Sequence, residues 1–263
     1  MSTALLWAAG GTGFTFLMTA LGSAMVFFFR KEMKMDVQRL FLGFAAGVMI
    51  AASVWSLLIP AIEEAEAQGR SGLVPAAGGF VLGVLFLMLM DNLMPHLHAF
   101  AGEPEGMSST WKRTTLLMTA VTLHNIPEGM AVGLSFALAA QHGDPAAYTG
   151  AMALAVGMGV QNFPEGAAIS LPLKQEGVKS GKAFVMGAMS AIVEPIFGIL
   201  AVLVAAKLEP VMPWLLSFAA GSMLYVVVEE LIPEAHLGEH SHVGTMGVMA
   251  GFLIMMILDV ALG

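Results

Sequence analysis

The sequence predicts an all-α membrane protein, a single bundle of eight transmembrane helices that occupies residues 1–263. Hydrophobic residues make up 57% of the chain and charged residues only 11%, whereas soluble domains have about 25% charged residues. The mean hydropathy is +0.81. The apolar residues gather in stretches of about 20 or more, which is the length that an α-helix needs to cross a bilayer. No polar stretch is long enough for a domain outside the membrane, so we expect one domain.

Four of the predicted helices lie in the first part of the chain, at 3–29, 38–62, 72–96 and 114–139. The first ends before the basic residues Arg30 and Lys31, and the second ends before the acidic residues Glu63 and Glu64. The fourth begins after the basic residue Lys112. Each stretch is mostly apolar and is bounded by polar residues, as expected of a membrane-spanning helix.

The other four predicted helices lie at 147–172, 182–206, 211–234 and 243–262. Glycines recur four residues apart within four of the eight helices, as Gly43/Gly47, Gly79/Gly83, Gly129/Gly133 and Gly247/Gly251. Such pairs let helix backbones approach closely in lipid. We therefore expect tight helix packing at each of these pairs.

The basic residues predict the orientation of the bundle, because cytoplasmic loops carry an excess of Lys and Arg. One set of alternating loops holds Arg70 and Lys207. The other set holds nine of the eleven basic residues, namely Arg30, Lys31, Lys34, Arg39, Lys112, Arg113, Lys174, Lys179 and Lys182. We place this second set in the cytoplasm. With eight spans, both termini then face outward.

Two related motifs interrupt the apolar character of the fourth and fifth predicted helices. The first is HNIPEG at 124–129, and the second is QNFPEG at 161–166. An ionisable side chain at the centre of a bilayer costs roughly 3 kcal/mol, so acids within spans indicate a functional site. The sixth predicted helix adds a further acid beside a proline, Glu194-Pro195.

Helix geometry indicates how these motifs present their side chains. His124 and Glu128 are four residues apart and share one helix face, while Asn125 lies about a quarter turn round. A proline inside a helix has no backbone N–H to donate, so the helix tends to bend. We predict bends in helices four, five and six at Pro127, Pro164 and Pro195.

If the three bends meet, one imidazole, three carboxylates and three amides converge. This set of nitrogen and oxygen ligands suits Zn²⁺ and could admit Fe²⁺, Mn²⁺ or Cd²⁺. Three carboxylates could also bridge two ions. The chain has no cysteine, which excludes disulfides and thiolate ligands. The alternative is that these polar residues only join helices through hydrogen bonds.

The motifs HNIPEG and QNFPEG, followed by the glutamate of VEP, resemble the signature of the ZIP (Zrt-, Irt-like protein) metal transporters, in their bacterial GufA-like branch. The resemblance extends to AASVWSLL, DNLMPHLH and VVEELIPEAH. It implies a bacterial inner-membrane protein that moves divalent metal into the cytoplasm by an elevator-like motion of helices one, four, five and six. It also implies a binuclear metal site and a homodimer.

Carried over by position, the implied metal ligands are His124, Asn125, Glu128, Gln161, Asn162, Glu165 and Glu194. Some relatives have an acid where this chain has Asn162, which bears on the second metal position. Met49 and Ser56 match positions that line the metal path of the family. Asp91, His96, Glu229 and Glu230 form either a release route toward the cytoplasm or a hydrogen-bonded cluster at helix ends.

Other functions fit the sequence less well. An intramembrane metalloenzyme would need a pair such as HExxH, and HNIPEG lacks the second histidine. We therefore expect a transporter of metal ions and not an enzyme. A passive metal-selective channel stays open as an alternative. The chain has no phosphate-binding glycine loop that would indicate direct use of ATP, and no basic patch with aromatic residues that would indicate nucleic acid.

Overall fold

The computed structural model of the chain describes residues 2–28, 34–97, 106–107, 113–143, 145–236 and 242–262. The regular elements in these ranges are helical. The first four α-helices are α1 (Ser2–Ala24), α2 (Met35–Ala52), α3 (Ile59–Ala67) and α4 (Leu73–Leu93). They are followed by α5 (Arg113–His142), α6 (Pro145–Gln175), α7 (Ser180–Ser190), α8 (Val193–Ala205), α9 (Met212–Val226), α10 (Ile232–Ala235) and α11 (Val243–Leu262).

Short helices of other types complete the bundle. η1 (Met25–Phe27) and η3 (Glu209–Val211) are 3₁₀-helices, whereas η2 (Ser53–Leu58) and η4 (Val227–Leu231) are π-helical turns. Each π-turn ends two residues before a proline, Pro60 or Pro233. A proline removes the N–H that would continue the α-helical ladder, and a wider turn accommodates the loss. α2 thus continues through η2 into α3, and α9 continues through η4 into α10.

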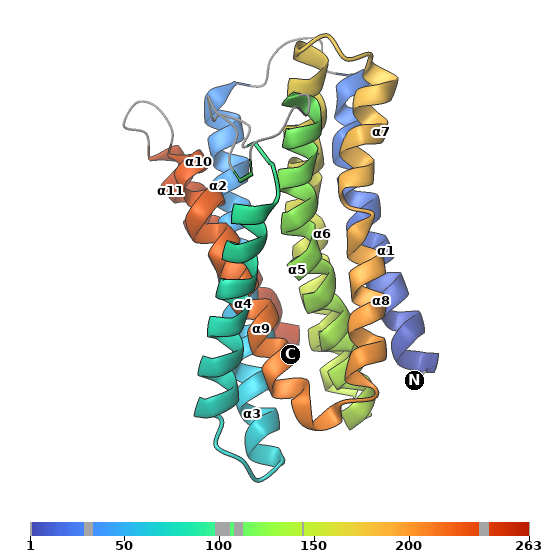
Figure 1. The fold of residues 1–263 in the computed structure, drawn as a ribbon, viewed down its shortest axis with the longest axis vertical. Coiled ribbons are helices and arrows are strands. Elements are labelled where there is room, and N and C mark those ends of the chain that lie inside the picture. Colours follow the sequence, from blue (N-terminus) through green and yellow to red (C-terminus); the bar gives the residue numbers. More distant parts are fainter. Residues whose placement is uncertain are drawn as a thin grey trace.

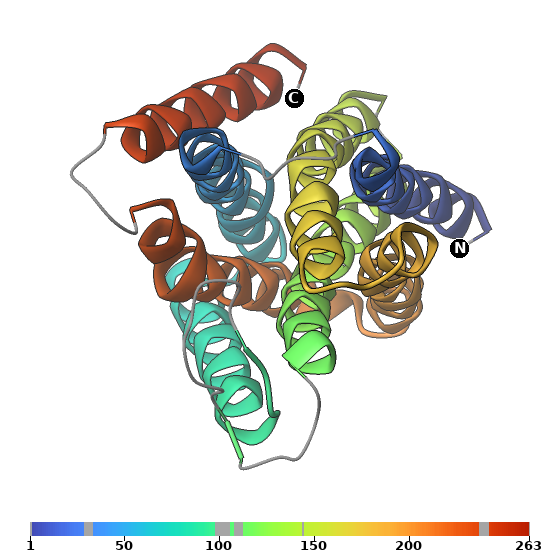
Figure 2. The same ribbon diagram turned by 90° about the horizontal axis from the view of Figure 1, so that it is seen from above.

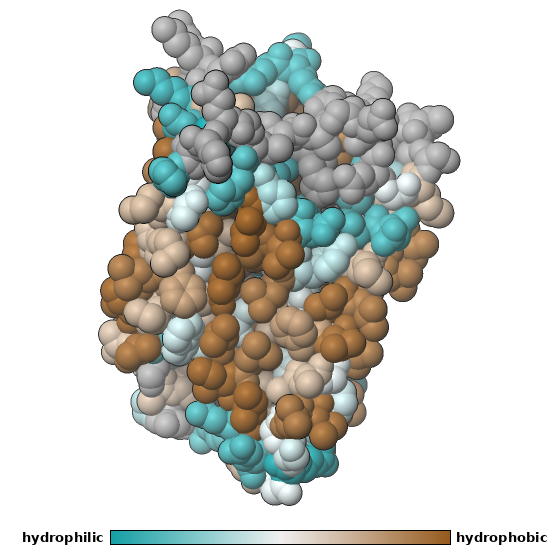
Figure 3. All heavy atoms as spheres, turned by 90° about the vertical axis from the view of Figure 1, so that its left-hand side faces the viewer, coloured by the Kyte–Doolittle hydropathy of each residue, from teal (hydrophilic) through white to brown (hydrophobic). Residues whose placement is uncertain are grey.

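Six helical stretches of the described residues are long and apolar enough to cross a membrane: Ser2–Phe27, Met35–Ala67, Leu73–Leu93, Ser180–Ala205, Met212–Ala235 and Val243–Leu262. Each coincides with one predicted span. α5 and α6 coincide with the other two predictions and are 30 and 31 residues long. They are not among the six because the polar residues of their motifs make them less apolar. Figure 3 shows a belt of hydrophobic side chains between two polar ends, as expected of an integral membrane protein.

The helices form two groups that lie side by side (Figure 2). One group, called here the α1 group, contains α1, α5, α6, α7 and α8. The other, called the α2 group, contains α2, α3, α4, α9, α10 and α11. Within the groups, α1 packs on α6, α5 on α8, α2 on α11, and α4 on α9. Each motif-bearing helix therefore has a partner within the α1 group.

Glycines lie where these helix pairs approach most closely. Gly43 and Gly47 of α2 lie against the backbone of α11, and Gly247 and Gly251 of α11 lie against α2. The same arrangement holds where α4 meets α9 and where α5 meets α8, through Gly79, Gly83, Gly129 and Gly133. A Cβ at any of these eight positions would collide with a carbonyl oxygen of the neighbouring helix. The predicted tight packing at the four glycine pairs is confirmed.

The sixth predicted span is divided into α7 and α8, which follow one another end to end (Figure 1). Pro195 has no N–H for the Ala191 carbonyl, which instead accepts a 3.0 Å hydrogen bond from the Glu194 N–H. The chain therefore tightens at Ala191 and Ile192, just before Glu194. α5 and α6 stay helical through Pro127 and Pro164, so the predicted bends at these two prolines stay a prediction.

The two ends of the bundle differ in charge. Among the described residues, Lys34, Lys174 and Lys179 lie at the end where α6 leads into α7 (top of Figure 1), which we call the basic end. Arg70 and Lys207 lie at the opposite end, near α3 and the start of α9. Three of the basic residues used for the predicted orientation, Arg30, Lys31 and Lys112, fall outside the described residues.

Candidate metal site

α5 and α6 bring the two motifs together within the bundle, and α8 adds its acid. The side chains of Asn125, Glu128, Gln161, Asn162 and Glu194 are no more than 2% exposed. Polar groups buried this deeply among apolar helices need hydrogen-bond partners, because burying an unpaired one costs a free energy of about 2–7 kcal/mol. Their partners therefore indicate what the site is built to hold.

Two glycines allow this convergence. Gly129, which follows Glu128, lies against the backbone of Glu194, and Gly166, which follows Glu165, lies against the backbone of Thr19. Because neither glycine has a side chain, α8 and α1 reach the helices that carry the acids. The final glycine of each motif thus has a packing role.

The three acids of the site lie close enough to affect one another. Glu128 is within electrostatic range of both Glu165 and Glu194, and Glu165 is within range of Glu194. Among the described residues, the buried oxygens Glu128 Oε2, Glu165 Oε1 and Asn125 Oδ1 have no hydrogen-bond partner. Asn125 lies beside Glu165. Three unpaired ligand oxygens around mutually repelling carboxylates favour a bound cation, which would offset both costs.

A chain of hydrogen bonds connects Glu194 of α8 to α1 and α6. The Thr15 hydroxyl of α1 donates to Glu194 Oε2, and Asn162 Nδ2 donates to Glu194 Oε1 at 2.9 Å. Gln161 Nε2 donates to Asn162 Oδ1, and the Gln161 side chain also lies beside Glu128. Glu194 is thus connected through two amides to the acid on α5.

His124 lies at the border between the two helix groups. Its Nε2 contacts the carboxylate of Glu230, which belongs to η4 of the α2 group. The side chain of His124 is 13% exposed and that of Glu230 is 5% exposed. His124 is also within electrostatic range of Glu165. The imidazole therefore lies between an acid of its own group and an acid of the other.

A cavity connects this site to the basic end. Its inner part is lined by His124, Glu128, Gln161, Glu165 and Glu230. From there it extends between α2, α5 and α6, where it is lined by Gln38, Phe41, Leu42, Ala45, Met49, Ala120, Val121, Pro164, Ala168 and Pro172. Glu234 of α10 also lines it. The cavity gives an ion a route between the site and the basic end.

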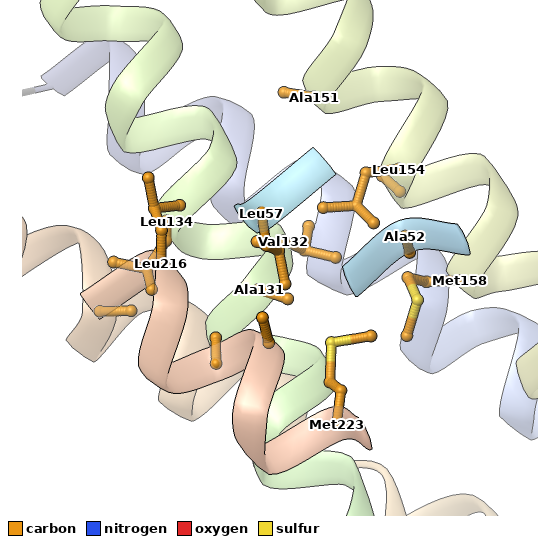
Figure 4. Packing of buried hydrophobic residues seen from close by; sticks show 14 of the residues in the cluster. Ala52, Leu57, Ala131, Val132, Leu134, Ala151, Leu154, Met158, Leu216 and Met223 are labelled. Atoms are coloured by element: carbon orange, nitrogen blue, oxygen red, sulfur yellow. The ribbon is translucent and has the colours of Figure 1, made fainter. Parts of the chain in front are cut away.

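A layer of packed apolar side chains separates the site from the end of the bundle opposite the basic end (Figure 4). It includes Ala52, Leu57, Val132, Leu134, Leu154, Met158, Leu216 and Met223, which come from α2, η2, α5, α6 and α9. On α5 this layer follows Glu128, and on α6 it precedes Gln161. Most of these side chains are less than 2% exposed. Among the described residues, the bundle is therefore open from the site toward the basic end and closed toward the opposite end.

A second cavity lies beyond the apolar layer, between α3, α5, α6 and α11. Ser56 lines it and donates a 2.6 Å hydrogen bond to Asp259 of α11. Glu64 of α3 also lines it, and its Oε2 lies 2.8 Å from His142 Nε2 of α5. Ser56 was predicted as part of the metal path, and the structure places it here, separate from the other predicted residues.

The other residues of the predicted path have different positions. Met49 is 1% exposed and lines the cavity that leads to the site. Asp91 lies 2.9 Å from His96 Nε2 and accepts a 3.2 Å hydrogen bond from the Tyr225 hydroxyl. Glu229 is exposed and does not line the cavity. Asp91 thus contacts both His96 and Tyr225 and lies near Glu230, which leaves the release route and the hydrogen-bonded cluster both open.

Among the described residues, no group of three or more His, Asp or Glu side chains has the mutual spacing of a metal site. His124 is turned toward Glu230, and Glu194 is held by Thr15. Three of the other five predicted ligands, Asn125, Gln161 and Asn162, are amides. The seven predicted ligands are thus gathered in one region, but they are not arranged around a single centre.

Thr15 is the site residue that sequence reasoning missed. Thr12, Thr15 and Thr19 of α1 are all fully buried and lie on one helix face. Hydroxyl residues three and four apart in an otherwise apolar span are a signal that could have placed α1 at the site. The partner of that face, Glu194, lies 179 residues away and could not be identified from spacing.

The chain is similar in sequence to several known proteins. The family model described as "ZIP Zinc transporter" matches residues 102–259. The chain is 36% identical to the human zinc transporter ZIP11, over 96% of both chains. It is 37% identical to the zinc transporter GufA of Myxococcus xanthus, over 93% of this chain and 94% of that protein. It is 36% identical to the zinc transporter ZIPB of Bordetella bronchiseptica, over 97% of this chain and 80% of that protein.

Proposed function

We propose that this chain, which belongs to the ZIP family in its GufA-like branch, carries Zn²⁺ across a membrane into the cytoplasm. The chain is an integral membrane protein of a transporter family and not an enzyme. The single observation that supports a metal cargo most strongly is the set of unpaired, buried oxygens on Asn125, Glu128 and Glu165.

The cargo ion would lie between α5 and α6. Glu128 and Glu165 would supply carboxylate oxygens, and His124 would supply an imidazole nitrogen. Gln161 lines the same part of the cavity and would add a weak amide oxygen. Nitrogen and oxygen ligands of this kind suit Zn²⁺, and they leave room for Cd²⁺, Fe²⁺ or Mn²⁺ as competing cargo. An amide ligand weakens the grip, as a carrier that must release its ion requires.

We propose that the α1 group moves against the α2 group during transport. The proposed ligands on α5 and α6, and Glu194 on α8, belong to the α1 group, whereas Met49 and Glu230 on the cavity wall belong to the α2 group. The apolar layer is built from both groups, so a relative sliding would open it and close the cavity at the basic end. In this proposal, the structure would represent a state in which the site is accessible from the basic end.

The basic end is proposed to face the cytoplasm, with eight spans and both termini outside. α5 and α6 would be the two spans beyond the six most apolar ones. In a bacterial inner membrane, a potential of 100 mV contributes about 4.6 kcal/mol for a doubly charged ion that moves inward. The electrical gradient alone thus provides a driving force for uptake.

The experiment is Zn²⁺ uptake into sealed proteoliposomes without any second substrate. We expect uptake that saturates with Zn²⁺ concentration, and competition by Cd²⁺, Fe²⁺ or Mn²⁺ identifies the other ions carried. Glu128→Gln removes one charge without changing the shape of the side chain and should abolish uptake. Glu66→Gln, on α3 far from the site, is the matched control and should retain it.

Two results would contradict this function. Wild-type uptake by a folded Glu128→Gln protein would show that the α5 acid does not hold the cargo. Single-channel conductance without saturation would favour the channel alternative, which the closed apolar layer argues against. The homodimer implied by the resemblance is tested separately by the mass of the protein in detergent.

A further inference from the structure

Glu194 differs from the other two acids of the site because both of its carboxylate oxygens accept hydrogen bonds. Oε2 accepts a hydrogen bond from the Thr15 hydroxyl, and Oε1 accepts one from Asn162 Nδ2 at 2.9 Å. The Thr15 hydroxyl also lies 3.0 Å from the Thr12 carbonyl, but it has one proton, and a carboxylate is the stronger acceptor. Both oxygens of Glu194 therefore have protein partners, whereas Glu128 and Glu165 each keep one oxygen without any among the described residues.

The amide of Asn162 fixes the direction of this network. Its Nδ2 faces Glu194 and its Oδ1 accepts from Gln161 Nε2, so a donor meets the carboxylate and an acceptor meets the amide. A carboxylate at position 162 could not donate to Glu194. It would repel Glu194 and would need a second cation between them, because like charges that are buried together are strongly unfavourable.

We infer that Glu194 positions the site instead of binding metal, and that the site holds one ion rather than the binuclear pair that the resemblance implies. The inference rests on the proposed function. Thr15 and Asn162 hold Glu194, and Glu194 orients the amides of Asn162 and Gln161. Gln161 in turn lies beside Glu128 and lines the same cavity. The network presents Glu128 to a single ion between α5 and α6.

The test counts Cd²⁺ ions by equilibrium dialysis of the purified full-length protein in detergent, as the difference between wild type and Glu128→Gln. Subtracting the two counts cancels the Cd²⁺ ions bound elsewhere on the protein, for example by loop histidines. We expect a difference of about one ion per chain. A binuclear site bridged by Glu128 would lose both ions and give about two, which would overturn the inference.

Asn162→Asp tests the role of the amide. We expect it to raise the count at the site from one ion to two, visible as a second ¹¹³Cd resonance. A single ion and a single resonance in a folded Asn162→Asp protein would overturn the argument that the amide excludes the second ion. Glu194→Gln should retain one ion, and complete loss of site-bound Cd²⁺ in a folded variant would show that Glu194 is a ligand.

Thr15→Val and Thr15→Ser form a matched pair. The valine removes the hydroxyl and should weaken Cd²⁺ binding about tenfold with the count unchanged, as is typical when the support of a metal ligand is lost. The serine keeps the hydroxyl and should retain the wild-type affinity. Equal affinity in both variants would contradict the role of the Thr15 hydroxyl. If Glu128→Gln binds as much Cd²⁺ as wild type, the proposed function fails, which is distinguishable from a count of two.

Discussion

His124 Nε2 contacts the carboxylate of Glu230, and this contact joins the α1 group to the α2 group at the inner end of the open cavity. His124 is also the only imidazole among the ligands that the motifs predict. In this state the imidazole is held by an acid that would compete with a metal ion for it. The contact therefore offers a means of lowering the affinity for the cargo where the cavity opens toward the basic end.

Glu230→Gln should reveal this competition. The amide holds His124 less tightly, so we expect Cd²⁺ binding in detergent to strengthen about three- to tenfold, which corresponds to the loss of one hydrogen bond of about 0.5–1.5 kcal/mol. Zn²⁺ uptake at saturating concentration should fall, because release becomes slower. The matched control is Glu229→Gln, since Glu229 is exposed and does not line the cavity. Weaker binding in Glu230→Gln would instead show that Glu230 is itself a ligand.

Metal binding should depend on pH in a defined direction. Carboxylates and imidazole bind Zn²⁺ only after losing their protons, so binding releases protons and must weaken as the pH is lowered. Equilibrium dialysis of Cd²⁺ in detergent at several pH values measures this without interference from proton-driven uptake. His124→Gln removes one of the titrating ligands and should make the curve less steep. Identical slopes for the two proteins would argue against His124 as a ligand.

Gly22→Ala should destabilise the bundle. A Cβ at Gly22 of α1 would collide with the Phe163 carbonyl of α6, and the backbone of α6 cannot move away without disturbing the QNFPEG motif. We expect a loss of about 1–3 kcal/mol, the usual cost of overpacking, seen as a lower temperature of thermal unfolding in detergent. Gly13→Ala is the control on the same helix, because nothing lies within 4 Å of a Cβ at Gly13. Equal unfolding temperatures for the two variants would contradict the close approach.

The Glu64–His142 pair should stabilise the closed end opposite the basic end. Glu64 Oε2 lies 2.8 Å from His142 Nε2, and Gln68 Nε2 donates to Glu64 Oε1 at 2.8 Å. The pair connects α3 of the α2 group to α5 of the α1 group, so in the proposed relative movement of the two groups it would break when that end opens. A partly exposed ion pair contributes little, and we expect Glu64→Gln to increase opening about two- to fivefold.

The chain has no cysteine, so a single Leu154→Cys residue in the apolar layer can report this opening. Its rate of reaction with a water-soluble maleimide added from the side opposite the basic end should rise by the same factor in Glu64→Gln. Glu66→Gln, on the same helix, is the control and should leave the rate unchanged. A rate in Glu64→Gln that matches the control would show that the pair does not hold this end closed.

Much of this architecture could be predicted from the sequence because the relevant forces are local. An apolar stretch of about 20 residues is costly in water and stable as a helix in lipid, wherever it lies in the fold. The i, i+4 spacing of His124 and Glu128 places both on one helix face regardless of neighbours. The glycine pairs likewise indicated close packing, although they did not indicate which helices would meet.

The predicted ligands illustrate the limit. The two motifs predicted one site, and the structure gathers all seven predicted ligands in one region. The partners of these side chains could not be predicted: His124 contacts Glu230, and Glu194 accepts hydrogen bonds from Thr15 and Asn162. Ser56, predicted on the same path, lies beyond the apolar layer.

Sequence alone determined that this chain is a helical membrane protein with acids and amides at two proline motifs, because composition and helical periodicity are properties of neighbouring residues. Only the tertiary structure decided that, among the described residues, the cavity at the site opens toward the basic end, that the Thr15 hydroxyl donates to Glu194, and that both oxygens of Glu194 accept hydrogen bonds. These features depend on which helix faces meet across separations such as the 179 residues between Thr15 and Glu194, which no local pattern encodes.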